Sequence, residues 1–162
     1  MITYCGKTSL LSTLDNNLII DLEDGSDYVE ALKVKVHNVK EIQDLCKAIE
    51  EAGKPYKFIT IDTITALEEM AKPLALALYR KSPAGMADQI TKDVLTIAHG
   101  GGYNFLRLAL EKIINMVAAV TTNVIIVGHV KDKAIVSADG TEMGNIKDFD
   151  LTGKENKKNK II

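Results

Sequence analysis

A short stretch near the start of the chain has the residue types of a phosphate-binding loop. Gly6, Lys7 and Thr8 match the end of the pattern G-x-x-x-x-G-K-[ST]. In such a loop the backbone N–H groups and the lysine hold phosphate, and the hydroxyl binds Mg²⁺. The first glycine of the pattern should stand at position 1, where the chain has Met1. The tripeptide alone is common, so it indicates a nucleotide site only with support from other residues.

Three further polar residues follow apolar runs that are typical of strands. Asp62 ends one such run, and a carboxylate there could hold a metal ion beside a bound phosphate. Glu23 follows another run and could deprotonate an attacking water, while His129 follows the most apolar run of the chain. Each has an ordinary alternative: Asp62 and Thr63 as a helix cap, Glu23 as an exposed loop acid, and His129 as a structural residue. Their shared position at strand ends favours a common site.

The elements that must position these residues alternate between strands and helices. We expect strands at residues 2–4, 18–20, 32–36, 58–62 and 123–127, and a hairpin of 134–136 with a strand around Met143. We expect helices at 7–14, between a cap at Asn38 and an end at Gly53, at 64–80 with Pro73 inside, at about 88–97 and at 103–120. Such alternation predicts an α/β fold with a mainly parallel sheet, whose ligands bind beyond the carboxyl ends of the strands.

Two smaller features have a structural interpretation. The adjacent Glu68 and Glu69 predict a solvated helix face. The three glycines at 100–102 follow a helix rather than a strand, so we interpret them as a flexible joint and not as a phosphate cradle.

Composition limits the classes of function. The chain has 162 residues, of which 46% are hydrophobic and 26% charged, which suits one domain with its own core. A net charge of −2 gives no general attraction to nucleic acid, so contact with DNA would need a local patch. We find no apolar run that could span a bilayer, no secretory signal, and only two cysteines, so we expect a cytoplasmic protein without a disulfide framework.

Four stretches occur in a fixed order along the chain: GKTS at 6–9, IIDLEDG at 19–25, FITIDTITAL at 58–67 and VIIVGHV at 124–130. Together they resemble RecA-like P-loop ATPases, and in particular the short phage-encoded members linked to single-strand annealing and DNA recombination. The resemblance covers roughly residues 1–153. It implies a three-layer αβα sandwich with a mainly parallel central sheet and one ATPase core at 1–153, followed by a lysine-rich tail at 154–162. Family members continue into further strands near the tail, so the C-terminal strands are expected to be incomplete.

The resemblance also implies which residues bind the nucleotide and its metal. Gly6, Lys7, Thr8 and Ser9 would belong to the phosphate loop, with Lys7 on the phosphates and Thr8 on Mg²⁺. Asp62 would be the Walker B acid, which is the second protein group at the metal. The implied ligands are therefore ATP and Mg²⁺.

The same resemblance implies roles for the remaining two candidates. Glu23 would be the catalytic glutamate that activates water, with Lys7 assisting at the phosphates. His129 would be a polar sensor of the γ-phosphate. In the family the strand that ends here at Val127 lies between the first and central strands, which would put His129 beside the nucleotide.

Partners follow from the resemblance more than from the residues. It implies single-stranded DNA, a single-strand-binding protein, and a homo-oligomeric ring or filament in the host cytoplasm, in which a neighbour supplies an arginine. Arg80 and Arg107 are the only arginines, so the finger must be one of them. The cationic residues near the expected DNA-facing loops are Lys131, Lys133 and four lysines at 154–160, with no aromatic residues between them for base stacking.

The phosphate loop departs from the family pattern. About four residues are missing between Tyr4 and Cys5, and a strand cannot turn around a triphosphate without them. One explanation is that the sequence lacks residues at this junction, which would then be a chain break. The other is a truly short loop in a degenerate, non-hydrolysing nucleotide-binding or assembly module. We favour the first because the later stretches are intact.

Overall fold

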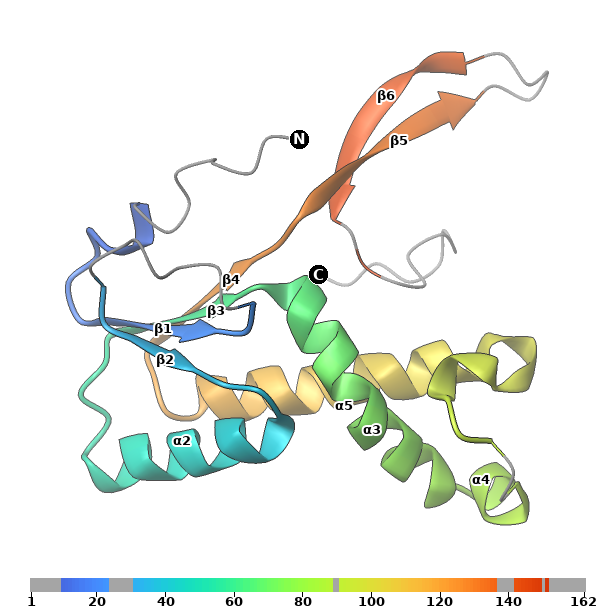
Figure 1. The fold of residues 1–162 in the computed structure, drawn as a ribbon, viewed down its shortest axis with the longest axis horizontal. Helices are drawn as coiled ribbons and strands as arrows, with labels where there is room; N and C mark the ends of the chain where they lie inside the picture. Colours follow the sequence, from blue (N-terminus) through green and yellow to red (C-terminus); the bar gives the residue numbers. More distant parts are fainter. Residues whose placement is uncertain (1–9, 24–30, 89–90, 137–141, 150, 152–162) are drawn as a thin grey trace.

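The structure is a computed structural model that describes residues 10–23, 31–88, 91–136, 142–149 and 151. Figure 1 shows the arrangement of its elements. In chain order they are β1 (Asn17–Asp21), β2 (Lys33–Lys35), α2 (Val39–Glu51), β3 (Phe58–Asp62), α3 (Ile64–Arg80), α4 (Pro83–Ala87), the 3₁₀ turns η1 (Val94–Thr96) and η2 (Ala98–Gly100), α5 (Gly101–Ala118), β4 (Asn123–Val127), β5 (Val130–Val136) and β6 (Glu142–Phe149). The expected strand at 2–4, the Tyr4–Cys5 junction, residues 6–9 and the boundary at 153 lie outside the described residues.

The central sheet is parallel throughout its described part. Its strand order is β2-β1-β3-β4, and every neighbouring pair runs in the same direction. The register aligns the last residues of three strands, with Asp21 beside Asp62 and Asp62 beside Val127. The structure thus confirms the expected α/β class and parallel sheet, and it brings the carboxyl ends of β1, β3 and β4 to one edge.

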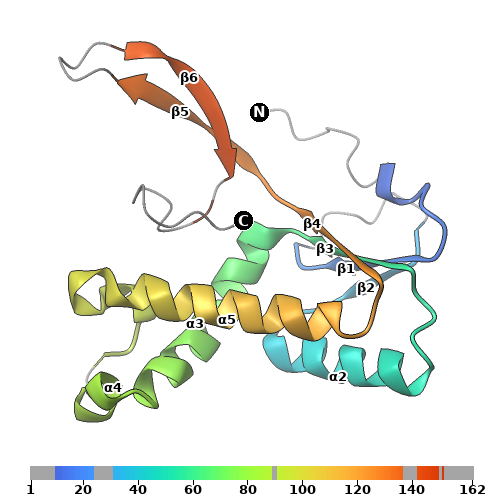
Figure 2. The ribbon, with the colours of Figure 1, turned by 180° about the vertical axis from the view of Figure 1, so that it is seen from behind.

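Helices cover one face of this sheet, and a shorter segment contacts the other. Figures 1 and 2 show α2, α3 and α5 together on the first face, where Ile20, Ile59 and Ile61 of the strands are at most 1% exposed. On the second face Leu11 packs with Ile19 and Val127 in a separate apolar cluster. Alternate strand residues therefore face two apolar layers, as expected for strands covered on both sides.

A buried polar pair fastens the segment before β1 to the sheet. Asn17 is 7% exposed and donates its side-chain amide to the Leu11 carbonyl oxygen at 2.9 Å. Its amide oxygen accepts a hydrogen bond from the Thr60 hydroxyl of β3 at 2.9 Å. Both polar groups are satisfied, so burial costs little and the position of Leu11 is fixed relative to two strands.

The cap expected at Asn38 is present at the start of α2. Asn38 Oδ1 accepts from the backbone N–H of Glu41 at 2.9 Å. The Glu41 carboxylate reaches back one residue beyond the cap and accepts from the His37 backbone N–H at 2.8 Å.

The buried face of α2 carries Cys46. Burial raises the pKa of its thiol, because the protein interior disfavours the charged thiolate.

The expected helix at 88–97 is wrong. The short helix lies earlier, in α4, where Ser82 caps it by accepting from the Gly85 N–H at 3.2 Å. The Asp88 carboxylate accepts a hydrogen bond from the backbone N–H of Thr91 at 3.2 Å. The Asp93 carboxylate accepts one from the backbone N–H of Leu95 at 2.9 Å. Short acidic side chains that bond nearby backbone groups compete with helix formation, which explains the turns found here.

Two interpretations of single positions also need correction. Glu68 is 4% exposed, and only Glu69 is solvated, with a 2.5 Å ion pair to Lys72. Glu68 follows the buried Ile64 by four residues, so it falls on the buried stripe of α3.

The glycines at 100–102 are not the flexible joint that the sequence suggested. A Cβ on Gly102 would lie 1.7 Å from the Val94 carbonyl oxygen, so this turn of α5 packs directly against the backbone of η1.

The hairpin of β5 and β6 is longer than expected and projects away from the sheet and helices (Figure 1). Its strands are antiparallel from Val130 opposite Phe149 to Val136 opposite Glu142. Within the described ranges, none of the helices combines the length and the apolar composition that a membrane span requires.

Candidate functional site at the carboxyl ends of the strands

Three residues that follow different strands meet at one edge of the sheet. Glu23 comes two residues after β1, Thr63 directly after β3, and His129 two residues after β4. Because the parallel strands end in register, the segments that follow them start side by side. This edge is where open α/β sheets bind ligands.

The backbone around Glu23 is held by its neighbours. The Leu22 N–H donates to the Asp62 carbonyl oxygen at 2.8 Å, which continues the pairing of β1 with β3 by one residue. The Glu23 N–H donates to Oδ1 of Asp21 at 3.1 Å, and Asp21 is 3% exposed. These two hydrogen bonds define the path of the backbone at Glu23, just beyond the end of β1.

The Glu23 carboxylate contacts both other strand ends. The Thr63 hydroxyl donates to Oε1 of Glu23. His129 Nε2 lies 3.1 Å from Oε2 and 3.3 Å from Oε1. The side chains of His129 and Glu23 are 49% and 37% exposed, so their interaction is partly screened by water and the carboxylate is accessible to solvent.

Thr63 both caps α3 and bonds Glu23, and the sequence suggested only the capping role. It is the N-cap of α3, and its Oγ1 accepts from the Ala66 N–H at 3.4 Å. The peptide bond that joins it to Asp62 is cis. The capping role was expected, but the bond to Glu23 was not, because the two residues are 40 positions apart in sequence. A hydroxyl directly after a strand-ending acid is the signal that could have suggested it.

Asp62 lies beside this cluster at the end of β3 and is partly buried. The register puts it next to the buried Asp21 of β1. Oxygen ligands of this kind suit Mg²⁺, which usually takes one or two carboxylates and completes its coordination with water and phosphate. Within the described ranges no group of three or more His, Cys, Asp or Glu residues could hold a metal. The Asp62 carboxylate at the strand ends is a group that could serve such a metal as one of its ligands.

A comparison with family models gives one match, to a family described as "AAA domain", over residues 3–162. The chain belongs to this family. Neither a search of curated proteins nor a search of solved structures found a match. AAA domains are P-loop ATPases, so membership indicates a nucleotide-binding, ATPase-like protein.

The match spans all the candidate residues of this AAA domain, but the structure places only some of them. Glu23 and His129 are in contact, and Asp62 lies in the same strand-end register. Four candidates, Gly6, Lys7, Thr8 and Ser9, lie outside the described residues, so their positions relative to the cluster stay a prediction. The match to the AAA domain begins at residue 3 and therefore includes this stretch.

Proposed function

We propose that this protein is an Mg²⁺-dependent ATPase of RecA-like type that acts in phage DNA recombination or single-strand annealing. The observation that carries the ATPase proposal is the contact of Glu23 with Thr63 and His129, which joins residues from three strand ends around one accessible carboxylate. Membership of the AAA-domain family supports a nucleotide as the ligand.

In the proposed reaction Glu23 is the general base. It accepts a proton from water while the water oxygen forms a bond to the γ-phosphorus of ATP. The bond between that phosphorus and the bridging oxygen breaks, and its electron pair leaves with ADP. Lys7 holds the phosphates, and His129 contacts the γ-phosphate. Thr8 and Asp62 would hold Mg²⁺, which when bound neutralises charge on the phosphates.

The free edge of β4 supports a phosphate loop beside this cluster. In the described part of the sheet β4 pairs only with β3, and its apolar Ile126 is 42% exposed. The family resemblance puts the strand of the phosphate loop along this edge. Residues 2–4 in that place would cover Ile126 and bring Lys7 to the side of His129.

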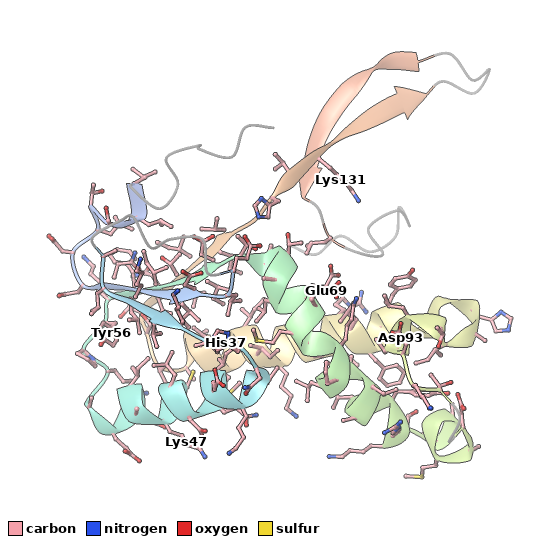
Figure 3. All side chains as sticks on the ribbon, viewed as in Figure 1. His37, Lys47, Tyr56, Glu69, Asp93 and Lys131 are labelled. Carbon is pink, nitrogen blue, oxygen red and sulfur yellow. The ribbon has the colours of Figure 1, made fainter. Side chains whose placement is uncertain are left out.

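The proposal of action on DNA rests on the resemblance, and the hairpin supports it. Figure 3 shows Lys131 at the base of the hairpin, only two residues after His129. Its side chain is exposed. Strand β5 starts directly after His129 and extends away from the sheet (Figure 1). It would offer single-stranded DNA, or a single-strand-binding protein, a surface that is connected to the nucleotide site.

The positions of the two arginines suit a homo-oligomer. Arg80 ends α3 and Arg107 lies in the first half of α5, in the helical region away from the strand ends (Figure 1). Neither arginine follows a strand end, and we propose that one of them acts at the site of a neighbouring subunit. Arg80 already donates to the Thr91 carbonyl oxygen at 3.4 Å, whereas Arg107 has no hydrogen bond or ion pair with other described residues. We therefore propose Arg107 as the finger.

The direct test is ATP hydrolysis by the purified protein with Mg²⁺, with and without single-stranded DNA. We expect phosphate release that stops when EDTA removes the metal and that increases when DNA is added. Release that persists in EDTA would contradict Mg²⁺ dependence. Hydrolysis that single-stranded DNA leaves unchanged would contradict the recombination role but not the ATPase.

A second candidate function is a nucleotide-binding or assembly module that does not hydrolyse ATP. The shortness of the phosphate loop, which lacks about four residues of the pattern between Tyr4 and Cys5, favours it. Such a module would bind a fluorescent ATP analogue without releasing phosphate, and Glu23→Gln would alter neither property. Phosphate release that depends on Glu23 would exclude it.

A further inference from the structure

The Thr63 hydroxyl bonds two partners, and only one of them belongs to the helix cap. It accepts from the Ala66 N–H at 3.4 Å and donates its own proton to Oε1 of Glu23. A hydroxyl has one donor and two acceptor sites, so both bonds form together. The cap uses an acceptor site of the oxygen, and Glu23 uses the single proton.

The two bonds to the Glu23 carboxylate differ in how firmly their donors are held. Thr63 is 2% exposed and fixed between β3 and α3. The His129 side chain is 49% exposed and lies after β4, with solvent on one side. Thr63 is therefore the more firmly held partner of Oε1, whereas His129, whose Nε2 lies 3.1 Å from Oε2 and 3.3 Å from Oε1, is the partner that can turn away from the carboxylate.

We infer that Thr63 is a positioning residue for Glu23, an inference that rests on the proposed ATPase function. Its hydroxyl holds Oε1, so that Oε2 is the oxygen that takes the proton from the attacking water once His129 turns to the phosphate. A carboxylate whose second oxygen is fixed by a buried donor keeps one orientation through this exchange of partners. Orientation of the base is a recognised part of the catalytic effect.

The helix cap alone would give a different result from positioning. Loss of an N-cap lowers stability and by itself leaves turnover unchanged. Asn38 is the matched control, because it caps α2 with a 2.9 Å bond to the Glu41 N–H and lies outside the Glu23 cluster. A purely structural role for Thr63 predicts that Thr63→Val, like Asn38→Ala, lowers the melting temperature and leaves kcat unchanged.

The experiment compares steady-state ATP hydrolysis and thermal unfolding of these variants. Thr63→Val should lower kcat on the order of tenfold or more, as for a lost hydrogen bond to a charged group, with KM for ATP unchanged. Thr63→Ser, which keeps the hydroxyl, should restore kcat to near the parent value. Asn38→Ala should lower the melting temperature and leave kcat unchanged.

A double-mutant comparison shows whether Thr63 acts through Glu23. In a Glu23→Gln background, Thr63→Val should lower kcat no further, because the base that it positions is gone. If Thr63→Val does not fold, Thr63→Ala replaces it, since alanine removes the hydroxyl without placing a methyl group against the carboxylate.

Several outcomes would overturn the inference. An unchanged kcat in Thr63→Val, no rescue by serine, or an equal fall in the Glu23→Gln background would each remove the positioning role while the ATPase function stands. A parent protein that releases no phosphate would instead overturn the proposed function itself, and the positioning role with it.

Discussion

Two carboxylates of this protein, Glu23 and Asp88, each accept hydrogen bonds from two side chains, but from very different parts of the chain. The donors to Glu23 are 40 and 106 positions away in sequence. Asp88 accepts from the Tyr79 hydroxyl at 2.9 Å and the Thr91 hydroxyl at 2.5 Å, which are 9 and 3 positions away. One cluster joins three strands of the sheet, and the other closes a turn between helices.

The contrast separates a candidate catalytic group from a structural one. The residues around Asp88 are closely packed. The ring of its partner Tyr79 packs edge-on against Phe105, with centroids 5.3 Å apart. A Cβ on Gly85 would lie 2.0 Å from the Tyr79 carbonyl oxygen, so there is no free space on that side either. The Glu23 cluster is open to water and contains a partner, His129, that is half-exposed. Removal of Asp88 should therefore affect stability, and removal of Glu23 should affect turnover.

The largest expected effect concerns the nucleotide that the Glu23 cluster should face. Lys7→Ala should abolish measurable ATP binding, because it removes the cation expected on the β- and γ-phosphates. Asp62→Asn should weaken only the Mg²⁺-dependent part of binding. Titration with a fluorescent ATP analogue measures both, and Lys47→Ala is the control, since Lys47 lies on the outer side of α2 (Figure 3). Parent-like binding by both variants would place the nucleotide elsewhere.

The next effect tests the contrast itself. Glu23→Gln should lower kcat on the order of a hundredfold or more while ATP affinity is kept, as for loss of a general base. Asp88→Asn should leave kcat unchanged and lower the melting temperature. Phosphate release and thermal unfolding of both variants give the comparison. Equal turnover in Glu23→Gln and the parent would move the role to another acid; Glu68, at 4% exposure, is poorly accessible to water.

A smaller effect should appear where α5 packs on η1. Gly102→Ala should destabilise the fold by roughly 1–3 kcal/mol, because its Cβ would overlap the Val94 carbonyl oxygen. Gly101→Ala is the control, since its Cβ would meet only the Ile97 side chain at 3.3 Å. Denaturant unfolding compares the two, and equal stability of both variants would show that this turn is loosely packed after all.

The smallest effect is pH-dependent and concerns Tyr79. Its hydrogen bond to the Asp88 carboxylate, then its burial, raise the pKa of Tyr79. A raised pKa in the folded state means that this bond stabilises the protein below pH of about 10, the ordinary tyrosine value, and is lost as pH rises through the raised value. Tyr79→Phe should therefore melt a few degrees lower than the parent at neutral pH, with a difference that shrinks in strong alkali. A difference that stays constant into strong alkali would show that ionisation of the Tyr79 hydroxyl is not linked to stability.

Sequence patterns predicted the regular elements well and the irregular connection poorly. The strands Phe58–Asp62 and Asn123–Val127 and the helix Ile64–Arg80 have the expected bounds, because continuous apolar runs and a clear cap define them. The connection at 82–100 was not predictable in the same way. There, the turns depend on single side-chain bonds of Asp88 and Asp93, which outweigh weak helix propensity.

The site was predictable as a set of strand ends but not as a set of contacts. Parallel strands had to bring Glu23, Asp62 and His129 to one edge. Register decides which of them touch, and register follows from pairing over the whole sheet rather than from any local stretch. For this reason the sequence did not predict the bond from Thr63 to Glu23. It did not predict the burial of Glu68 either, because that depends on how α3 packs against the rest of the fold.

The raised pKa of the buried Cys46 thiol makes the chain suitable for selective labelling. Of its two cysteines, Cys46 is 5% exposed and reacts slowly as a thiol, so any rapid reaction of the folded protein with a maleimide dye must occur at Cys5. Cys5 directly precedes Gly6, at the junction where the phosphate loop departs from its pattern. If Cys5 is labelled, the dye will report on the loop without any change of sequence, and slower labelling in the presence of ATP would then be an optical signal of nucleotide at that end of the chain.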